Sequence, residues 1–254
     1  MTRFNRLFAA ASLALGLASS ALAAPVLMHD YTLNGTLADA LGGPSLVAIN
    51  AGGTDGTIGA TGFSFPKNSG LQLTNGSFNA ANYSIEMAFS FDEIGSWRRI
   101  IDFKERSTDT GLYNLSGAIA FYPYTTGSGL FAPGQMVNII ITRDDATDMF
   151  NVYANGASVL SLLDTAGDAV FSTANETVNF FRDDLPVPNE ASAGFVDRIR
   201  FFDGVLSATE ARCLQTADPA ACGVASGGTV PEPASLGLVG LALLGLGAAR
   251  RRRA

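Results

Sequence analysis

The chain has 254 residues, a formal net charge of −7 and 15% charged residues. Two end segments, residues 1–23 and 230–254, hold six of its 16 basic residues but only one of its 23 acidic residues. The part between them therefore carries a net charge of −12. Such an acidic body excludes nucleic acid as a partner, because phosphate binding needs a basic surface.

The first 23 residues have the layout of a secretory signal. Arg3 and Arg6 precede an uncharged apolar stretch over residues 7–17, and the small-residue sequence Ala21-Leu22-Ala23 follows. A basic start, a short apolar segment and an A-x-A exit are typical of a cleavable signal peptide. We therefore predict an N-terminal signal helix, cleavage after Ala23 and export of the rest of the chain.

The body, residues 24–223, is long enough for one domain with a substantial core, and its pattern is one of short strands and turns. Residues 83–91 alternate cleanly, with Ile85, Met87, Phe89 and Phe91 on one face, which predicts a half-buried strand. Further strands are predicted at 26–33, 99–104, 117–122, 136–143, 149–154, 158–163, 177–181 and 194–203. Asn155-Gly156 predicts a tight hairpin, and Asn75-Gly76 another turn. Many short strands separated by such turns indicate an all-β antiparallel sandwich.

One short helix and one disulfide are predicted at the end of the body. Ser207 and Glu210 form a capping-box pattern that opens a helix of about eight residues, reaching Thr216. Cys213 and Cys222 are the two cysteines of the chain. In an oxidising compartment a pair this close is expected to form a disulfide, and a metal site would need more ligands.

Four stretches of the body resemble the LamG-like, concanavalin A-like jelly-roll family. In chain order they read TLNGTLADALGG, RRIIDFKERSTDTGLY, ITRDDATDMFNVYANG and AGFVDRIRFFDGVLSATEA. No single stretch is diagnostic, and the resemblance rests on their order across nearly the whole body. It implies a two-sheet jelly roll with a concave face that binds carbohydrate or protein, and frequently a structural calcium ion.

Asp197 is the candidate calcium ligand. A period of two in residues 194–203 puts it on the same face as Phe195 and Ile199, where an unpaired carboxylate is costly. Calcium is one partner that would offset this cost. The resemblance implies that role for Asp197, with Asp30 or Asp39 as helpers. The alternative is that Asp197 accepts hydrogen bonds from the backbone or from an arginine.

Aromatic side chains are the candidate sugar contacts, because sugar-binding jelly rolls stack ligands on exposed rings. Trp97 is the best candidate, followed by Tyr113, Tyr122 and Tyr124. No catalytic residue is predicted. The Glu-x-Asp-x-x-Glu string of laminarinase-type jelly-roll enzymes is missing from the sequence, and a Ser-His-Asp triad would have to use His29, the single histidine.

The last 25 residues carry a three-part signal. After a flexible linker, residues 224–229, come Pro231-Glu232-Pro233, an uncharged apolar run over residues 234–249 and four consecutive arginines. A helix of that length covers about 24 Å, and basic residues mark the cytoplasmic end of a transmembrane helix. We therefore predict a transmembrane helix at 234–249 that holds the precursor in the inner membrane.

The order of these parts resembles the PEP-CTERM sorting signal. The resemblance implies a Gram-negative bacterium and an exosortase that processes the chain near Pro231, Glu232 and Pro233. It also implies delivery to the cell surface or to an exopolysaccharide matrix. The sequence thus predicts an exported, non-catalytic, lectin-like module. The alternatives are a structural matrix component without a specific ligand and, less favoured, a divergent glycoside hydrolase.

Overall fold

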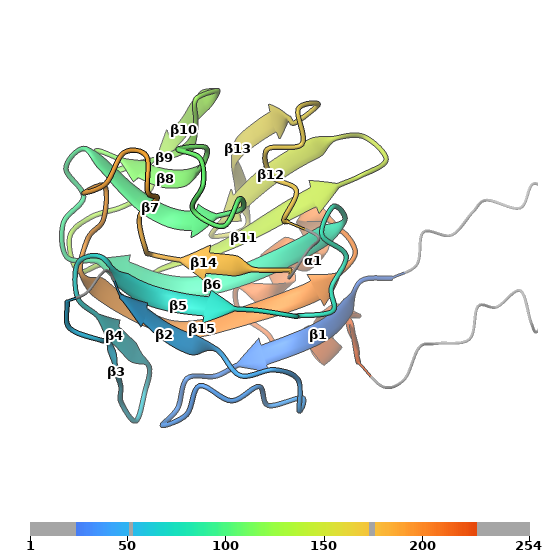
Figure 1. Cartoon of the computed structure of the whole chain (residues 1–254). Helices are drawn as coiled ribbons and strands as arrows, with labels where there is room; N and C mark the ends of the chain where they lie inside the picture. The colour runs from blue at the N-terminus through green and yellow to red at the C-terminus, as the bar shows by residue number, and fades with distance from the viewer. Residues whose placement is uncertain (1–23, 51–52, 173–175, 228–254) are drawn as a thin grey trace, which may run out of the picture.

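A computed structural model describes residues 24–50, 53–172 and 176–227 (Figure 1). The predicted signal helix with Ala23, the Pro231-Glu232-Pro233 motif and the apolar run at 234–249 lie outside the described residues. Within the described residues, no helix is long and apolar enough to cross a membrane.

The fold is a sandwich of two sheets, as predicted, and every strand pair is antiparallel except β1–β16. The first sheet has the order β13 (Ala157–Leu163), β12 (Met149–Ala154), β11 (Val137–Asp144), β6 (Tyr83–Phe91), β15 (Gly194–Asp203), β1 (Val26–Tyr31), β16 (Ala225–Ser226), and β4 (Phe63–Phe65) joins β15 to β3 (Thr57–Ile58). The second sheet has the order β10 (Thr125–Gly129), β9 (Ala118–Tyr122), β8 (Gly111–Leu115), β7 (Trp97–Asp102), β14 (Val178–Phe180), β5 (Ser69–Leu73), β2 (Val47–Asn50).

Phenylalanine dominates the core between the sheets. Strand β6 directs Ile85, Met87, Phe89 and Phe91 into it, which confirms the alternation read from the sequence. The rings interlock across the two layers: Phe65 and Phe181 stack with their centroids 4.3 Å apart. Such closely packed aromatic pairs add to the stability that burying their area provides.

The outer face of the first sheet is partly covered by the C-terminal part of the described chain. Helix α1 (Ala208–Leu214) packs its buried Ala211 and Leu214 against Ile140 and Phe202 of the sheet, and it lies behind the sheet in Figure 1. The predicted capping box is present, because Ser207 Oγ accepts from the Glu210 N–H at 3.2 Å and Glu210 Oε2 accepts from the Ser207 N–H at 2.7 Å.

Cys213 and Cys222 form the predicted disulfide, which ties α1 to the short 3₁₀ helix η1 (Pro219–Cys222). The chain then continues into β16, which pairs with β1. The two ends of the described chain therefore lie side by side. The disulfide and the β1–β16 pairing together close the sandwich at this edge.

Strand β6 differs from the prediction in one respect, because it is buried on both faces rather than on one. Its outward-facing Ser84 and Glu86 are 0% and 1% exposed. Ser84 Oγ donates to the Gly204 carbonyl and accepts from the Leu206 N–H. The chain segment between β15 and α1 folds back over this strand, which is a long-range contact that periodicity does not report.

Candidate functional site

The outer face of the second sheet carries an unusual set of polar and aromatic side chains. The register pairs Arg99 of β7 with Tyr113 of β8, and Gly111 of β8 with Tyr122 of β9. Paired residues, and residues two apart on one strand, share a face. Trp97, Arg99, Tyr113 and Tyr122 therefore all lie on the face turned away from the core.

Three of the four predicted sugar contacts come together on this face, and the fourth, Tyr124, lies against Phe121 instead. The Trp97 ring meets the Tyr113 ring and the Tyr122 ring edge to face, with both centroid distances at 5.4 Å. Tyr122 is 37% exposed and Trp97 is half-buried, whereas Tyr113 is fully buried. Trp97 and Tyr122 are thus available to a ligand, and Tyr113 lies beneath the surface, where it supports Trp97 instead of presenting a ring of its own.

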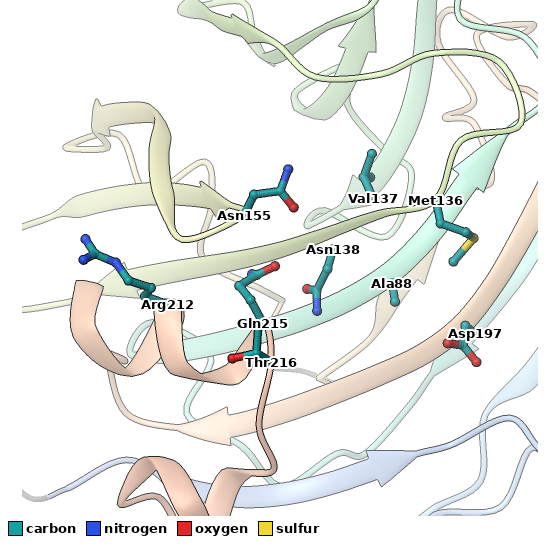
Figure 2. Close-up of a pocket in the computed structure, with 9 residues that line it drawn as sticks. All are labelled: Ala88, Met136, Val137, Asn138, Asn155, Asp197, Arg212, Gln215 and Thr216. Atoms are coloured by element: carbon teal, nitrogen blue, oxygen red, sulfur yellow. The ribbon is translucent and has the colours of Figure 1, made fainter.

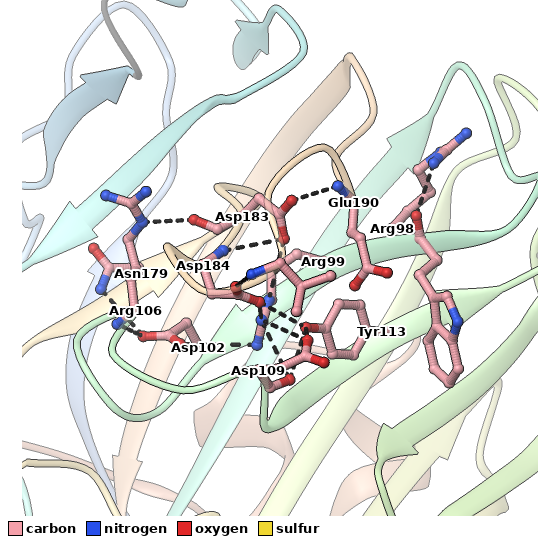
Figure 3. Close-up of polar contacts among 12 residues, drawn as sticks. Arg98, Arg99, Asp102, Arg106, Asp109, Tyr113, Asn179, Asp183, Asp184 and Glu190 are labelled. Carbon is pink, nitrogen blue, oxygen red and sulfur yellow. Dashed lines mark hydrogen bonds and ion pairs between the residues drawn. The ribbon is translucent and has the colours of Figure 1, made fainter.

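Arg99 is the centre of the polar part of this face. Its side chain is fully buried, and its guanidinium lies 4.1 Å from the centroid of the Tyr113 ring, a cation–π contact (Figure 3). It donates to Asp184 Oδ2 and, at 2.9 Å, to the Thr110 carbonyl. The carboxylates of Asp102, Asp109 and Asp183 surround it at 3.8, 3.8 and 3.9 Å.

The loop after β14 brings the acidic residues over Arg99. Asp183 accepts hydrogen bonds from the backbone N–H groups of Asp184 and Glu190, which closes the loop on itself. The Arg99 N–H donates to the Glu190 carbonyl at 2.7 Å and so ties the loop to β7. Asp184 and Glu190 therefore reach this face from a different part of the chain than Arg99 does.

Carboxylate oxygens of Asp109, Asp184 and Glu190 lie within 4.8 Å of one another, the one such acidic group among the described residues. Burial, together with the negative charges of Asp109, Asp183 and Asp184, raises the pKa of Glu190 to about 7. Burial and the neighbouring Asp184 also raise the pKa of Asp109. The group can therefore hold a proton near neutral pH, and the Tyr113 hydroxyl donates into it at 2.9 Å from Asp109 Oδ1.

These charged residues were not predicted as part of a site. The available signal was the segment Trp97–Asp102, WRRIID, in which two arginines and an aspartate flank a pair of isoleucines. A buried position for Arg99 also requires carboxylates beside it. Its strongest partner, Asp184, lies 85 positions further along the chain, and nothing in the local sequence connects the two.

Asp197 lies elsewhere, and the structure corrects the face predicted for it. A β-bulge shifts the register between Val196 and Arg198, so Val196 and Ile199 point into the core while Asp197 is exposed. It lies at a cavity on the outer face of the first sheet, close to Ala88 (Figure 2). The Asp197 carboxylate is therefore not buried on an apolar face, and it does not need a calcium ion to offset such burial.

The two predicted helpers are occupied by other partners. Asp39 is buried and each of its oxygens accepts two hydrogen bonds, from the Asp30 and Leu41 N–H groups and from the Gly43 N–H and the His29 ring. Asp30 forms an ion pair with Arg200 at 3.1 Å. Asp30, Asp39 and Asp197 do not converge as one ligand set in the described part of the chain. A structural calcium ion therefore stays a prediction. These three residues do not form a shared ligand set for it.

Comparisons with known proteins agree with this architecture. Residues 65–212 match the model of the concanavalin A-like lectin/glucanases superfamily. The chain belongs to this superfamily. Residues 229–253 match the PEP-CTERM protein-sorting motif, which indicates an exported protein that an exosortase processes. A search of curated proteins gave no match.

Solved structures with similar folds include both enzyme domains and binding domains. Domain 4 of AbnA, a GH43 extracellular arabinanase from Geobacillus stearothermophilus in complex with arabinotriose, is 19% identical with a TM-score of 0.58, over 75% of this superfamily member and 98% of that chain. A Trypanosoma rangeli sialidase mutant displaying trans-sialidase activity is 12% identical with a TM-score of 0.56, and the match covers 74% of this chain and 32% of the sialidase chain. The botulinum neurotoxin serotype C1 binding domain is 11% identical with a TM-score of 0.55, over 75% and 51%. At these identities the likeness shows the fold alone.

Proposed function

We propose that this protein binds carbohydrate on the outer face of its second sheet. The observation that carries the proposal is the pairing of Trp97 and Tyr122, two accessible rings in edge-to-face contact, with a polar group at their side. Aromatic rings bind the apolar faces of sugars, while carboxylates accept hydrogen bonds from sugar hydroxyls. Buried Arg99 and Tyr113 hold both halves of the site in place.

The carboxylates suit a neutral sugar in this part of the site. Asp109 and Glu190, the half-buried members of the acidic group, offer acceptors to neighbouring sugar hydroxyl groups, while buried Asp184 accepts from Arg99. The arabinanase domain with a related fold was crystallised with arabinotriose, and this chain covers 98% of that domain. That likeness supports the proposal at the level of the fold.

We place the protein at the cell surface or in an extracellular matrix. The PEP-CTERM motif supports this destination, with an exosortase acting near Pro231-Glu232-Pro233 and an exopolysaccharide as the natural partner. Before processing, residues 234–249 would hold the precursor in the inner membrane. Mass spectrometry of the mature protein from its host would test this: retention of the four C-terminal arginines would contradict processing.

The binding proposal is tested by a panel of neutral oligosaccharides, arabinan and galactan fragments included, titrated onto the full chain in non-ionic detergent. Trp97→Ala and Tyr122→Ala should each weaken binding about tenfold, since one stacked ring contributes on the order of 1–2 kcal/mol. Tyr124→Ala is the matched control, because this predicted contact is 49% exposed but lies against Phe121 and donates its hydroxyl to Asp168, away from Trp97.

Binding that is unchanged in both Trp97→Ala and Tyr122→Ala would move the site off this face. A panel without any binding would favour the alternative of a matrix component that has no specific ligand. The same panel repeated with calcium and with a chelator would test for the predicted ion. A melting temperature that does not respond to either would argue against structural calcium.

The acidic group also favours a second candidate, glycoside hydrolysis. A Glu190 with a pKa of about 7 would be protonated in part at neutral pH, as a general acid must be, and Asp109 and Asp184 provide carboxylates close by. Release of reducing ends from a bound polysaccharide, lost in Glu190→Gln, would support hydrolysis. Binding without release of reducing ends would support the non-catalytic function.

A further inference from the structure

A second pocket opens on the other side of the loop that carries Asp184. Its volume is about 460 Å³, and its lining includes Arg106, Arg182, Asp184, Leu185 and Pro188. Asp184 is common to this pocket and to the acidic group beside Trp97. A ligand that lies across the loop would therefore reach both places.

Two arginines define the chemistry of this pocket, whose lining also includes the buried residues Asp183 and Asp184. Neither Arg106 nor Arg182 forms an ion pair within the part of the chain that the structure describes, whereas Arg99, Arg143 and Arg200 each form several. The Nε atom of Arg182 is buried and has no hydrogen-bond partner. Arg106 donates from Nε to the Asp183 carbonyl at 2.6 Å, and its terminal amino groups point away from the carboxylates (Figure 3).

Both guanidinium groups lie in unfavourable surroundings. Burial lowers the pKa of Arg182, and the charge of Arg106 lowers it further. Burial also lowers the pKa of Arg106, by more than the charges of Asp102, Asp183 and Asp184 raise it. The backbone at Arg106 is also strained, because Glu105 and Arg106 have φ values of 52° and 63°, in the left-handed region. The Arg106 N–H donates to Asp102 Oδ1 at 2.6 Å, which holds the strained turn in place.

The carboxylates around Arg106, those of Asp102, Asp183 and Asp184, already face other donors, and Asp102 lies 3.8 Å from Arg99. Asp183 accepts from the backbone N–H groups of Asp184 and Glu190, and Asp184 accepts from Arg99 and from the Val187 N–H. The arginines are therefore held near carboxylates that are directed to other donors. An anion that enters the pocket would meet two unpaired cations.

We propose that this pocket binds the carboxylate of an acidic sugar, a uronate residue of a polysaccharide. A carboxylate matches the two parallel donors of a guanidinium, and a bidentate pair is the strongest form of this contact. Leu185, 67% exposed, and Pro188 provide an apolar edge for the face of the sugar ring. This inference rests on the proposed function. The uronate would belong to the same polysaccharide whose neutral sugar units stack on Trp97 and Tyr122.

The overall charge of the protein makes the assignment specific. The region between the two end segments carries −12, which repels polyanions at long range. Recognition of a uronate would therefore depend on these two arginines, and measurement at about 0.15 M salt would screen the general repulsion. Under these conditions, the local contact and not the net charge determines the preference.

The test is calorimetric titration of the full chain in non-ionic detergent with a galacturonate trisaccharide, its methyl ester and the matching neutral galactotriose. The free acid should bind at least tenfold more tightly than the methyl ester or the galactotriose. Arg182→Gln should abolish this preference and leave galactotriose binding unchanged, and Arg182→Lys should restore part of it. Arg212→Gln, which removes an exposed arginine on α1, is the matched control and should have no effect.

The outcomes separate this inference from the proposed function. Equal binding of acid and ester, or a preference that survives Arg182→Gln, would overturn the uronate pocket, and galactotriose binding that depends on Trp97 would leave the proposed function standing. Acid binding that needs Arg182 but not Trp97 would support the pocket and contradict the aromatic site. Tighter binding of a sulfated galactan than of the uronate would overturn the carboxylate assignment in favour of a sulfate ester.

Discussion

Replacing Glu190 by glutamine should make the protein more stable at pH 8 and flatten its stability between pH 5 and 8. Burial and the charges of Asp109, Asp183 and Asp184 raise the pKa of Glu190 from 4.5 to about 7. A carboxyl group whose pKa is higher in the folded state binds more protons when folded. The free energy of unfolding therefore falls as the pH rises from about 4.5 to about 7, and the loss is complete above that range.

The size of this effect follows from the pKa change. Each pH unit corresponds to about 1.4 kcal/mol, so a fully applied change would cost about 3 kcal/mol at pH 8. Because Glu190 is only partly buried, solvent screening reduces the expected gain in Glu190→Gln to about 1 kcal/mol. At pH 4, where the wild-type side chain is protonated in both states, the two proteins should differ little.

The assay is urea unfolding at pH 4, 6 and 8, followed by the fluorescence of Trp97, the single tryptophan and a neighbour of this site. Glu93→Gln is the matched control, since it removes the same charge from an exposed ion pair with Arg98 and should cost less than about 0.5 kcal/mol at any pH. A Glu190→Gln protein that is less stable at pH 8, or that keeps the wild-type pH dependence, would refute the reasoning.

Three further changes test the Arg99 network and two other parts of the fold. Arg99→Met should lower the free energy of unfolding by about 3–5 kcal/mol at pH 7, because it leaves buried carboxylates unpaired. In urea titrations, lowering the pH to 5 should recover part of this loss. A loss below about 1 kcal/mol at pH 7 would contradict the proposed role of the Arg99 network. Burial alone would raise the pKa of Asp39, but hydrogen bonds from His29 and the backbone outweigh it and lower the pKa. Its contribution is therefore present at neutral pH and lost as the pH falls below about 4, so Asp39→Asn should destabilise the protein by about 2 kcal/mol at pH 7 and much less at pH 3, as measured by thermal unfolding. Replacing Cys213 and Cys222 by serine should cost about 2–3 kcal/mol for so short a loop, and a melting temperature equal to that of the wild type would show that the C-terminal edge is stable without the disulfide.

Local pattern was enough to predict the class of the fold and many of its parts. The alternation in β6, the Asn155-Gly156 hairpin and the capping box at Ser207 each depend on residues a few positions apart, and the structure contains all three. The strands of the second sheet were predicted less completely. Strands β2, β5, β8 and β10 are short or rich in glycine and polar residues, and they form because neighbouring strands pair with them.

For Asp197, the alternation read from the local sequence predicted the wrong face of the strand. Strict alternation placed it on the core face of β15, but one extra residue at the bulge reverses the face of every residue beyond it. The bulge is a feature of the pairing between β15 and β6, in which Val196 pairs with Phe89 and Arg198 with Ala88. A count along β15 alone contains no information about it.

The sequence by itself determined that this is an all-β sandwich with a phenylalanine core, a disulfide near its end and a sorting motif after it. It also singled out Trp97 and Tyr122, together with Tyr113 and Tyr124, because aromatic residues can be identified one at a time, but it did not show which of them are exposed on one face. Only the tertiary structure decided that Arg99, Asp184 and Glu190 meet beside those rings, and that Arg106 and Arg182 share a pocket in which neither forms an ion pair within the described residues. The reason is physical: a charge is buried, paired or left unpaired according to which distant segments the sheets bring within a few ångströms of it.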